Sequence, residues 1–213
     1  FQLETDHRET TSSETKSICL FSPGVQWNHK NHFRLVSAFL YLLESGQIPS
    51  NTLLCLSSIR PVEAGHNLTQ QLLAQSPWAE NVIFLPYLTK AQLAEFHLKC
   101  NGYVLPSLHE GYGIPLIESV ANGIPTLSAR FPSIDALSDV PDFIQFIEDP
   151  SDTGDLIEAL GRFINDLPSA HPRPDLCPTR QSFKEQLCSA IDHSLTIARQ
   201  KPNLSLPSIK APQ

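Results

Sequence analysis

Methionine is absent from this chain of 213 residues. A complete translated product begins with methionine, and a chain of this length usually contains several. We therefore expect that an N-terminal portion of the protein is missing from this sequence. The length and the 41% content of hydrophobic residues suffice for one sizeable core, so a single folded domain with polar ends is predicted.

A basic cluster is absent as well. The 15 lysines and arginines are outnumbered by 22 acidic residues, and the net charge is -7. Because nucleic-acid backbones require a basic surface, we expect no nucleic-acid partner. No run of about eighteen apolar residues is present, so no transmembrane segment is predicted. We expect a cytoplasmic location and leave open a peripheral position at the inner membrane face, reached through the missing portion.

Paired cysteine spacings are lacking too. The five cysteines are Cys19, Cys55, Cys100, Cys177 and Cys188. Their number is odd and their positions are scattered, which is not typical of zinc or redox sites. We expect free thiols and no metal.

Apolar segments alternate between strand-like and helix-like patterns along the chain. Strands are predicted near residues 17–22, 52–57, 81–85, 102–105, 125–128 and 143–147. Helices are predicted near residues 30–45, 66–75, 90–99, 114–122, 153–166 and 181–199. This alternation predicts an α/β fold, a Rossmann-like parallel sheet with helices on both faces. Residues 17–199 would form the domain, residues 1–16 a polar linker or terminus, and residues 200–213 a disordered tail.

The stretch from Leu105 to Ser128 carries the clearest functional pattern. A buried strand ends near Leu105, and Gly111 and Gly113 allow a tight loop after it. Pro115 suits the first turn of a helix, which we expect to begin near Gly113 and to end at Asn122-Gly123. The free N–H groups of that helix would point out of the carboxyl end of a strand, where open α/β sheets bind phosphates.

Two carboxylates flank this expected anion site. Glu110 lies in the loop and Glu118 about one turn inside the helix, so both can face the same crevice. Carboxylates do not attract a diphosphate, but they accept hydrogen bonds from sugar hydroxyls. The residues therefore indicate a ligand in which a phosphate is joined to sugars.

At these residues the chain resembles a known family. The segment Glu110-Gly111-Tyr112-Gly113-Ile114-Pro115, with Glu118 and with Asn122-Gly123-Ile124-Pro125 after it, is similar to the donor-site signature of retaining glycosyltransferases of family 4. The resemblance spans roughly residues 17–165 and implies one half of a GT-B fold. It implies that Glu110 contacts the donor sugar, that Glu118 contacts the ribose, and that backbone amides around Ile114 to Leu116 hold the diphosphate. The missing portion would then be the acceptor-binding domain.

A second matching stretch is Lys30-Asn31-His32, just before or within the first turn of a helix. The resemblance implies that Lys30 binds the diphosphate, where a fixed cation stabilises the leaving group. The chain departs from the family pattern at Gly24, where many members have arginine, and at Pro86, Ala129 and Ala136. Whether His29 or Arg34 substitutes for the arginine stays open.

The nucleobase would lie against the backbone from Leu85 to Tyr87. We expect this wall because we take the strand that ends there to neighbour the strand that leads into the signature loop.

The leading hypothesis is the donor-binding domain of a glycosyltransferase that needs neither cofactor nor metal. It would move a mannose-like or glucose-like hexose from a GDP- or UDP-linked donor to a glycan or lipid-linked acceptor, in polysaccharide biosynthesis. One alternative is a non-catalytic nucleotide-sugar binding or scaffold module. Others are a glycoside hydrolase that uses Glu110 and Glu118, and a related GT-B epimerase.

Overall fold

The strands and helices of this chain are seen in a computed structural model. The structure describes residues 17–25, 27–57, 64–131, 134, 137, 139–168, 170 and 172–177. The linker predicted for residues 1–16, the helix predicted near 181–199 and the tail predicted for 200–213 lie outside the described residues, so they stay predictions.

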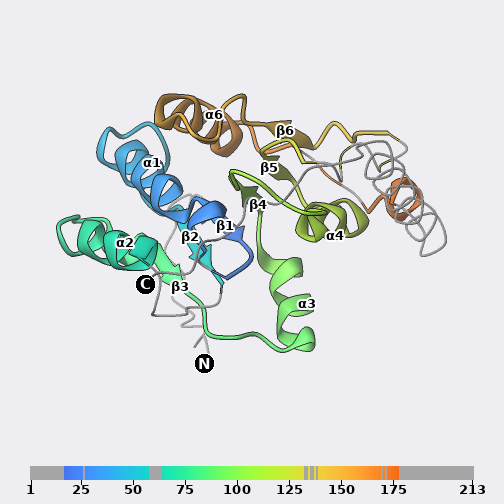
Figure 1. The fold of residues 1–213 in the computed structure, drawn as a ribbon, viewed down its shortest axis with the longest axis horizontal. Helices are drawn as coiled ribbons and strands as arrows, with labels where there is room; N and C mark the ends of the chain where they lie inside the picture. The colour runs from blue at the N-terminus through green and yellow to red at the C-terminus, as the bar shows by residue number, and fades with distance from the viewer. Residues whose placement is uncertain are drawn as a thin grey trace, which may run out of the picture.

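Six parallel strands form one sheet in the order β3-β2-β1-β4-β5-β6. The strands are β1 (Cys19–Ser22), β2 (Leu53–Leu56), β3 (Val82–Phe84), β4 (Gly102–Leu105), β5 (Thr126–Ser128) and β6 (Ile144–Phe146). Every predicted strand is present. The expected Rossmann-like sheet is therefore confirmed (Figure 1).

Helices cover both faces of this sheet (Figure 1). One face carries α1 (His32–Glu44), α2 (Ala64–Ala74) and α6 (Thr153–Asn165). The other face carries α3 (Lys90–Lys99) and α4 (Ile114–Asn122). Short 3-10 helices lie at Asn28–Lys30, Ala79–Asn81 and Pro174–Leu176.

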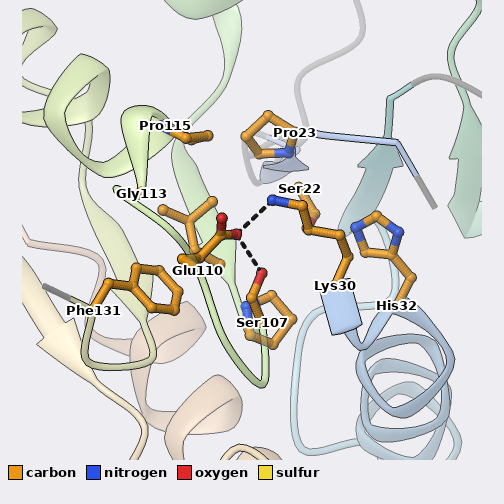
Figure 2. Close-up of a pocket in the computed structure, with 11 residues that line it drawn as sticks. Ser22, Pro23, Lys30, His32, Ser107, Glu110, Gly113, Pro115 and Phe131 are labelled. Atoms are coloured by element: carbon orange, nitrogen blue, oxygen red, sulfur yellow. Dashed lines mark hydrogen bonds and ion pairs between the residues drawn. The ribbon is translucent and has the colours of Figure 1, made fainter. Parts of the chain in front are cut away.

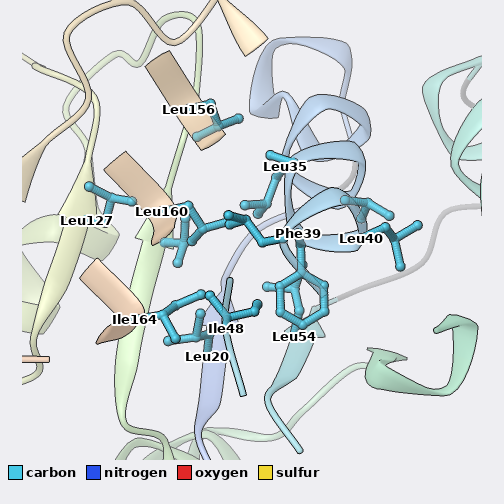
Figure 3. Close-up of a cluster of buried hydrophobic side chains, with 14 of the residues drawn as sticks. Leu20, Leu35, Phe39, Leu40, Ile48, Leu54, Leu127, Leu156, Leu160 and Ile164 are labelled. Carbon is cyan, nitrogen blue, oxygen red and sulfur yellow. The ribbon is translucent and has the colours of Figure 1, made fainter. Parts of the chain in front are cut away.

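Successive strand residues point to opposite faces, which divides the core into two clusters. Leu20, Val104 and Leu127 pack with α1 and α6, and Figure 3 shows this cluster around Phe39 and Leu160. Phe21 and Tyr103 pack beneath α3 and α4. All four residues of β4 are buried, as expected for a central strand covered on both faces.

Local sequence sets where two of the helices begin. The Thr89 side chain and Gln92 form a reciprocal capping box before α3. The Asp152 carboxylate accepts a hydrogen bond from the Asp155 N–H at the start of α6, at 3.0 Å.

The four described cysteines are free thiols, as predicted. Cys19 and Cys55 lie on neighbouring strands, and their sulfur atoms are 3.7 Å apart. Cys188 lies outside the described residues. Within the described ranges, no helix combines the length and the apolar character needed to cross a membrane.

Phe163 of α6 packs tightly against Gly102 of β4. A Cβ atom at this position would lie 2.9 Å from Cζ of Phe163 and 3.2 Å from the Pro125 carbonyl oxygen. We expect Gly102→Ala to lower the free energy of unfolding by about 1–3 kcal/mol, because the added methyl overpacks the core. Urea denaturation measures this change. Gly111→Ala is the matched control, since nothing lies within 4 Å of its Cβ position; equal stabilities of the two variants would contradict the prediction.

Candidate functional site

The site lies where the strand order reverses. β1 has β2 on one side and β4 on the other, so the connections after β1 and β4 leave their neighbouring carboxyl ends in opposite directions. Open α/β sheets bind ligands at this position. The two loops concerned are residues 23–31, described except for residue 26, and residues 106–113.

Asn31 joins these loops. It is buried and has a φ of 61°, in the left-handed region that asparagine tolerates better than most residues. Its side-chain amide donates hydrogen bonds to the carbonyl oxygens of Pro106, at 3.1 Å, and Pro150, at 2.6 Å. The Leu108 N–H donates to the His29 carbonyl at 2.7 Å, which adds a second link between the loops after β1 and β4.

These links bring Lys30 to Glu110. The Lys30 ammonium donates a hydrogen bond to Oε1 of Glu110 at 2.5 Å, and both side chains are only 14% exposed. The Ser107 hydroxyl donates to the same oxygen at 2.8 Å. Figure 2 shows the lysine and the glutamate reaching toward each other from opposite loops. The two residues that the sequence assigned to donor sugar and diphosphate therefore meet.

A small hollow, open to solvent, surrounds this pair. Its lining comprises Ser22, Pro23, Lys30, His32, Leu105, Pro106, Ser107, Glu110, Gly113, Pro115 and Phe131. Sequence reasoning missed Ser22, His32, Ser107 and Phe131. Ser107 stands three residues before Glu110, and His32 stands two residues after Lys30. Their proximity in the sequence to predicted site residues could have indicated them, whereas nothing in the sequence indicated Phe131.

The start of α4 forms another wall of the hollow. Gly113 caps the helix with a φ of 70°, and the helix ends at Gly123, as predicted. Leu116 is fully buried, and its N–H donates to the Gly113 carbonyl at 2.9 Å. Pro115 has no N–H. In the described part of the chain, the N–H groups of Gly113 and Ile114 have no protein acceptor. Of the predicted range from Ile114 to Leu116, only the Ile114 N–H therefore stays available, and the Gly113 N–H just before the range joins it.

Other predicted residues lie outside the lining of the hollow. Gly111 and Tyr112 belong to the same loop, Gly111 exposed and Tyr112 half-buried. Glu118 lies farther along α4 and is exposed, although partial desolvation raises the pKa of its carboxyl. Leu85 is half-buried and the Tyr87 side chain is 85% exposed.

The expected neighbour of the signature strand was wrong. The strand that ends before Leu85 is β3, and β2 and β1 separate it from β4. Sequence order does not determine spatial order in a parallel sheet, because each crossover connection can place the next strand on either side of the sheet.

Gly24 explains one departure from the family pattern. Its φ is 118°, and an added Cβ would lie 3.3 Å from Cε of Lys30. An arginine at this position would be strained in this backbone. Neither candidate substitute lines the hollow: Arg34 donates to Oδ1 of Asn31 at 3.0 Å, and the His29 ring lies 4.7 Å from that of His109.

A site of this kind on a doubly wound parallel sheet is typical of α/β domains that bind phosphorylated ligands. Comparison with protein families narrows the class. Residues 3–174 match the family described as glycosyl transferases group 1, and the chain belongs to this family.

Individual relatives agree with this family. The chain is 31% identical over 85 residues to the serotype-specific mannosyltransferase WbdA of Escherichia coli. The aligned part is 40% of this chain and 10% of that protein, so the chain spans about a tenth of the length of this relative.

Solved structures share the fold. Sucrose-phosphate synthase from Thermosynechococcus elongatus matches with a TM-score of 0.65 and 19% identity, over 85% of this chain and 46% of that chain. The C-terminal domain of a glycosyl transferase group 1 family protein, LpcC, from Francisella tularensis matches with a TM-score of 0.58 and 17% identity, over 70% of this chain and 76% of that chain. The sheet and its helices thus match the Rossmann-like fold of GT-B glycosyltransferases.

Asn31 contributes to stability through its side-chain hydrogen bonds and through its left-handed backbone, and two substitutions separate these contributions. Asn31→Gly keeps the left-handed backbone but leaves two carbonyls unbonded, so we expect a loss of about 2–3 kcal/mol in the free energy of unfolding. Asn31→Ala should cost about 1 kcal/mol more, because alanine is strained at this φ. Chemical denaturation of both variants measures the difference in the free energy of unfolding. An alanine variant as stable as the glycine variant would show that the left-handed backbone makes no separate contribution to stability.

His32 should make stability depend on pH. Burial, followed by the charges of Lys30 and His29, lowers its pKa from 6.5 to about 4. As the pH falls, the unfolded chain takes up a proton on this histidine before the folded chain does. The contribution of the neutral His32 to the free energy of unfolding is therefore complete above about pH 6.5 and is lost as the pH falls toward about 4. Between about pH 7 and about pH 5 the free energy of unfolding should fall by about 2 kcal/mol. Urea denaturation across this range should show a flatter profile for His32→Gln; identical slopes would contradict the assignment.

Proposed function

We propose that this chain is the donor-binding domain of a retaining glycosyltransferase of family 4, which moves a hexose from a nucleotide diphosphate sugar. The observation that carries the proposal is the contact of Lys30 with Glu110 at the reversal of the strand order. A cation and a carboxylate in one hollow suit a ligand in which a diphosphate is joined to a sugar.

The diphosphate would lie between Lys30 and the start of α4. The Lys30 ammonium supplies a full positive charge, and the N–H groups of Gly113 and Ile114 supply the partial charge of a helix N-terminus. Negative charge builds on the leaving nucleoside diphosphate as the glycosidic bond breaks, and these groups would stabilise it. We propose that they do so without a metal or another cofactor.

The donor sugar would contact Glu110. Ser107 and Lys30 both donate to Oε1 of this carboxylate, which holds the group in one orientation. Sugar hydroxyls could then donate to its other oxygen. Glu118 would contact the ribose farther along α4.

The likeness to a mannosyltransferase supports a hexose, with GDP-mannose or a UDP-hexose as the donor. We propose a glycan or lipid-linked acceptor in polysaccharide synthesis, bound by a further domain outside this chain. The reaction would take place in the cytoplasm or at the inner face of the membrane.

A second candidate function is nucleotide-sugar binding without turnover. The conformation of Gly24 supports it, because this backbone disfavours the arginine that many relatives use as a phosphate clamp. Turnover assays with the acceptor-binding domain restored distinguish the two candidates. Hydrolysis of glycosides has less support, since it needs two carboxyl groups around one bond and Glu110 lines the hollow without Glu118.

Thermal unfolding with GDP, UDP, ADP, GDP-mannose and UDP-glucose tests the proposed donor site. A ligand at 100 times its dissociation constant should stabilise the domain by about 2.7 kcal/mol. Lys30→Ala should weaken binding by about 10- to 100-fold, because it removes a charged hydrogen bond. Lys99→Ala is the matched control, since Lys99 pairs with Glu95 on the exposed face of α3. No stabilisation of well-folded protein by any of the five ligands would refute the donor site.

Glu110→Gln should have opposite effects on two ligands. The carboxylate beside Lys30 repels a free diphosphate, so the variant should bind GDP or UDP more tightly than the wild type. The preference for the sugar-linked nucleotide over the free nucleotide should fall, because the amide accepts sugar hydroxyls less strongly. Calorimetric titration measures both affinities, with Glu95→Gln as the control. An unchanged preference for the sugar-linked nucleotide would show that Glu110 does not recognise the sugar.

A further inference from the structure

His32 is a buried imidazole in the lining of the hollow. It is the first residue of α1, and its side chain is only 5% exposed. Figure 2 shows it beside Lys30, and both residues line the hollow together with Ser22. The donor site described above assigns His32 no role.

One nitrogen of the imidazole lacks a hydrogen-bond partner among the described residues. Its Nδ1 atom is buried and meets neither a donor nor an acceptor among the described residues. Leaving a buried polar atom unsatisfied costs about 1–3 kcal/mol, which an apolar side chain at this position would avoid. An unsatisfied buried atom in a side chain that lines a hollow calls for a functional explanation.

The surroundings keep this imidazole neutral when no anion is bound. Burial disfavours its charged form, and Lys30 and His29 repel an added proton. The N-terminus of α1 also disfavours a cation at its first residue. Glu110 faces the hollow from the loop after β4, but its carboxylate bonds to Lys30 and Ser107. Apart from Lys30, Glu110 and His32 itself, the residues that line the hollow carry no charge.

A diphosphate in the hollow would reverse the preference of His32 for its neutral form. Its negative charges would offset the Lys30 ammonium and favour the imidazolium. We propose that His32 is a further anion-binding residue, which takes up one proton from solvent when the diphosphate of a nucleotide enters the hollow. The proton leaves a solvent or buffer acid and forms the second N–H bond of the ring, and no bond between heavy atoms changes. The inference rests on the proposed donor site, and it gives the site a second cation where Gly24 stands in place of the arginine of many relatives.

Proton-linked calorimetry tests the proposal. GDP and UDP are titrated into the chain at about pH 6 in two buffers of different ionisation enthalpy, which counts the protons taken up on binding. The wild type should take up several tenths of a proton more than His32→Gln, and the proton equilibrium of the nucleotide itself cancels in this difference. The affinity of the wild type, relative to that of the variant, should be about tenfold higher at about pH 6 than at about pH 8.

Two controls make each outcome decisive. His97→Gln changes a partly buried histidine of α3 outside the lining of the hollow, and it should leave the proton count at the wild-type value. NMR of the imidazole nitrogens of the wild-type chain, with and without nucleotide, reports the charge of His32 even if the His32 variant folds poorly. Protonation only in the complex is the expected result.

The experiment distinguishes a failure of the role proposed for His32 from a failure of the proposed donor site. Nucleotide binding that depends on Lys30 but takes up equal numbers of protons in the wild type and in His32→Gln would overturn the role of His32 alone. A His32 ring that stays neutral in the complex would do the same. Absence of binding by the wild type at either pH would refute the proposed donor site, and the inference with it.

Discussion

The site depends on one residue in an unusual conformation. Asn31 turns the chain through the left-handed region between the loop after β1 and the start of α1. Its amide donates to carbonyls at Pro106 and Pro150, so the chain after β1, the chain after β4 and the chain after β6 are held together. This junction lies directly beside Lys30 in the sequence, which is why the lysine reaches Glu110 across the point where the strand order reverses.

Charge in the hollow is balanced within the protein. Lys30 is paired with Glu110, while burial keeps His32 neutral. A ligand that carries only negative charge must compete with Glu110 for the lysine, whereas a ligand that also carries hydroxyl groups can satisfy both residues. On the proposed function, this arrangement would favour a sugar-linked diphosphate over a bare one.

Much of the fold could be predicted, because most strands are short apolar runs and the longest helices carry an apolar face. The limits of α4 followed from Gly113, Pro115 and Gly123, whose backbone preferences act locally. The neighbour of β4 was predicted wrongly, because crossover connections determine strand order and no local pattern encodes them. The Leu116 amide was expected to be available, yet the first turn of α4 uses it within the helix.

The sequence by itself determined the class of this protein, since the glycines, the proline and the glutamates of one segment form a family pattern that local backbone chemistry explains. Only the tertiary structure decided which of those groups share a hollow. Lys30 and Glu110 are 80 residues apart and meet through parallel strand pairing, whereas Glu118 belongs to the same segment and lies outside the hollow. His32 lies next to Asn31 in the sequence, but only its burial in the packed structure and the nearby charge of Lys30 keep it neutral, and its Nδ1 atom has no partner among the described residues.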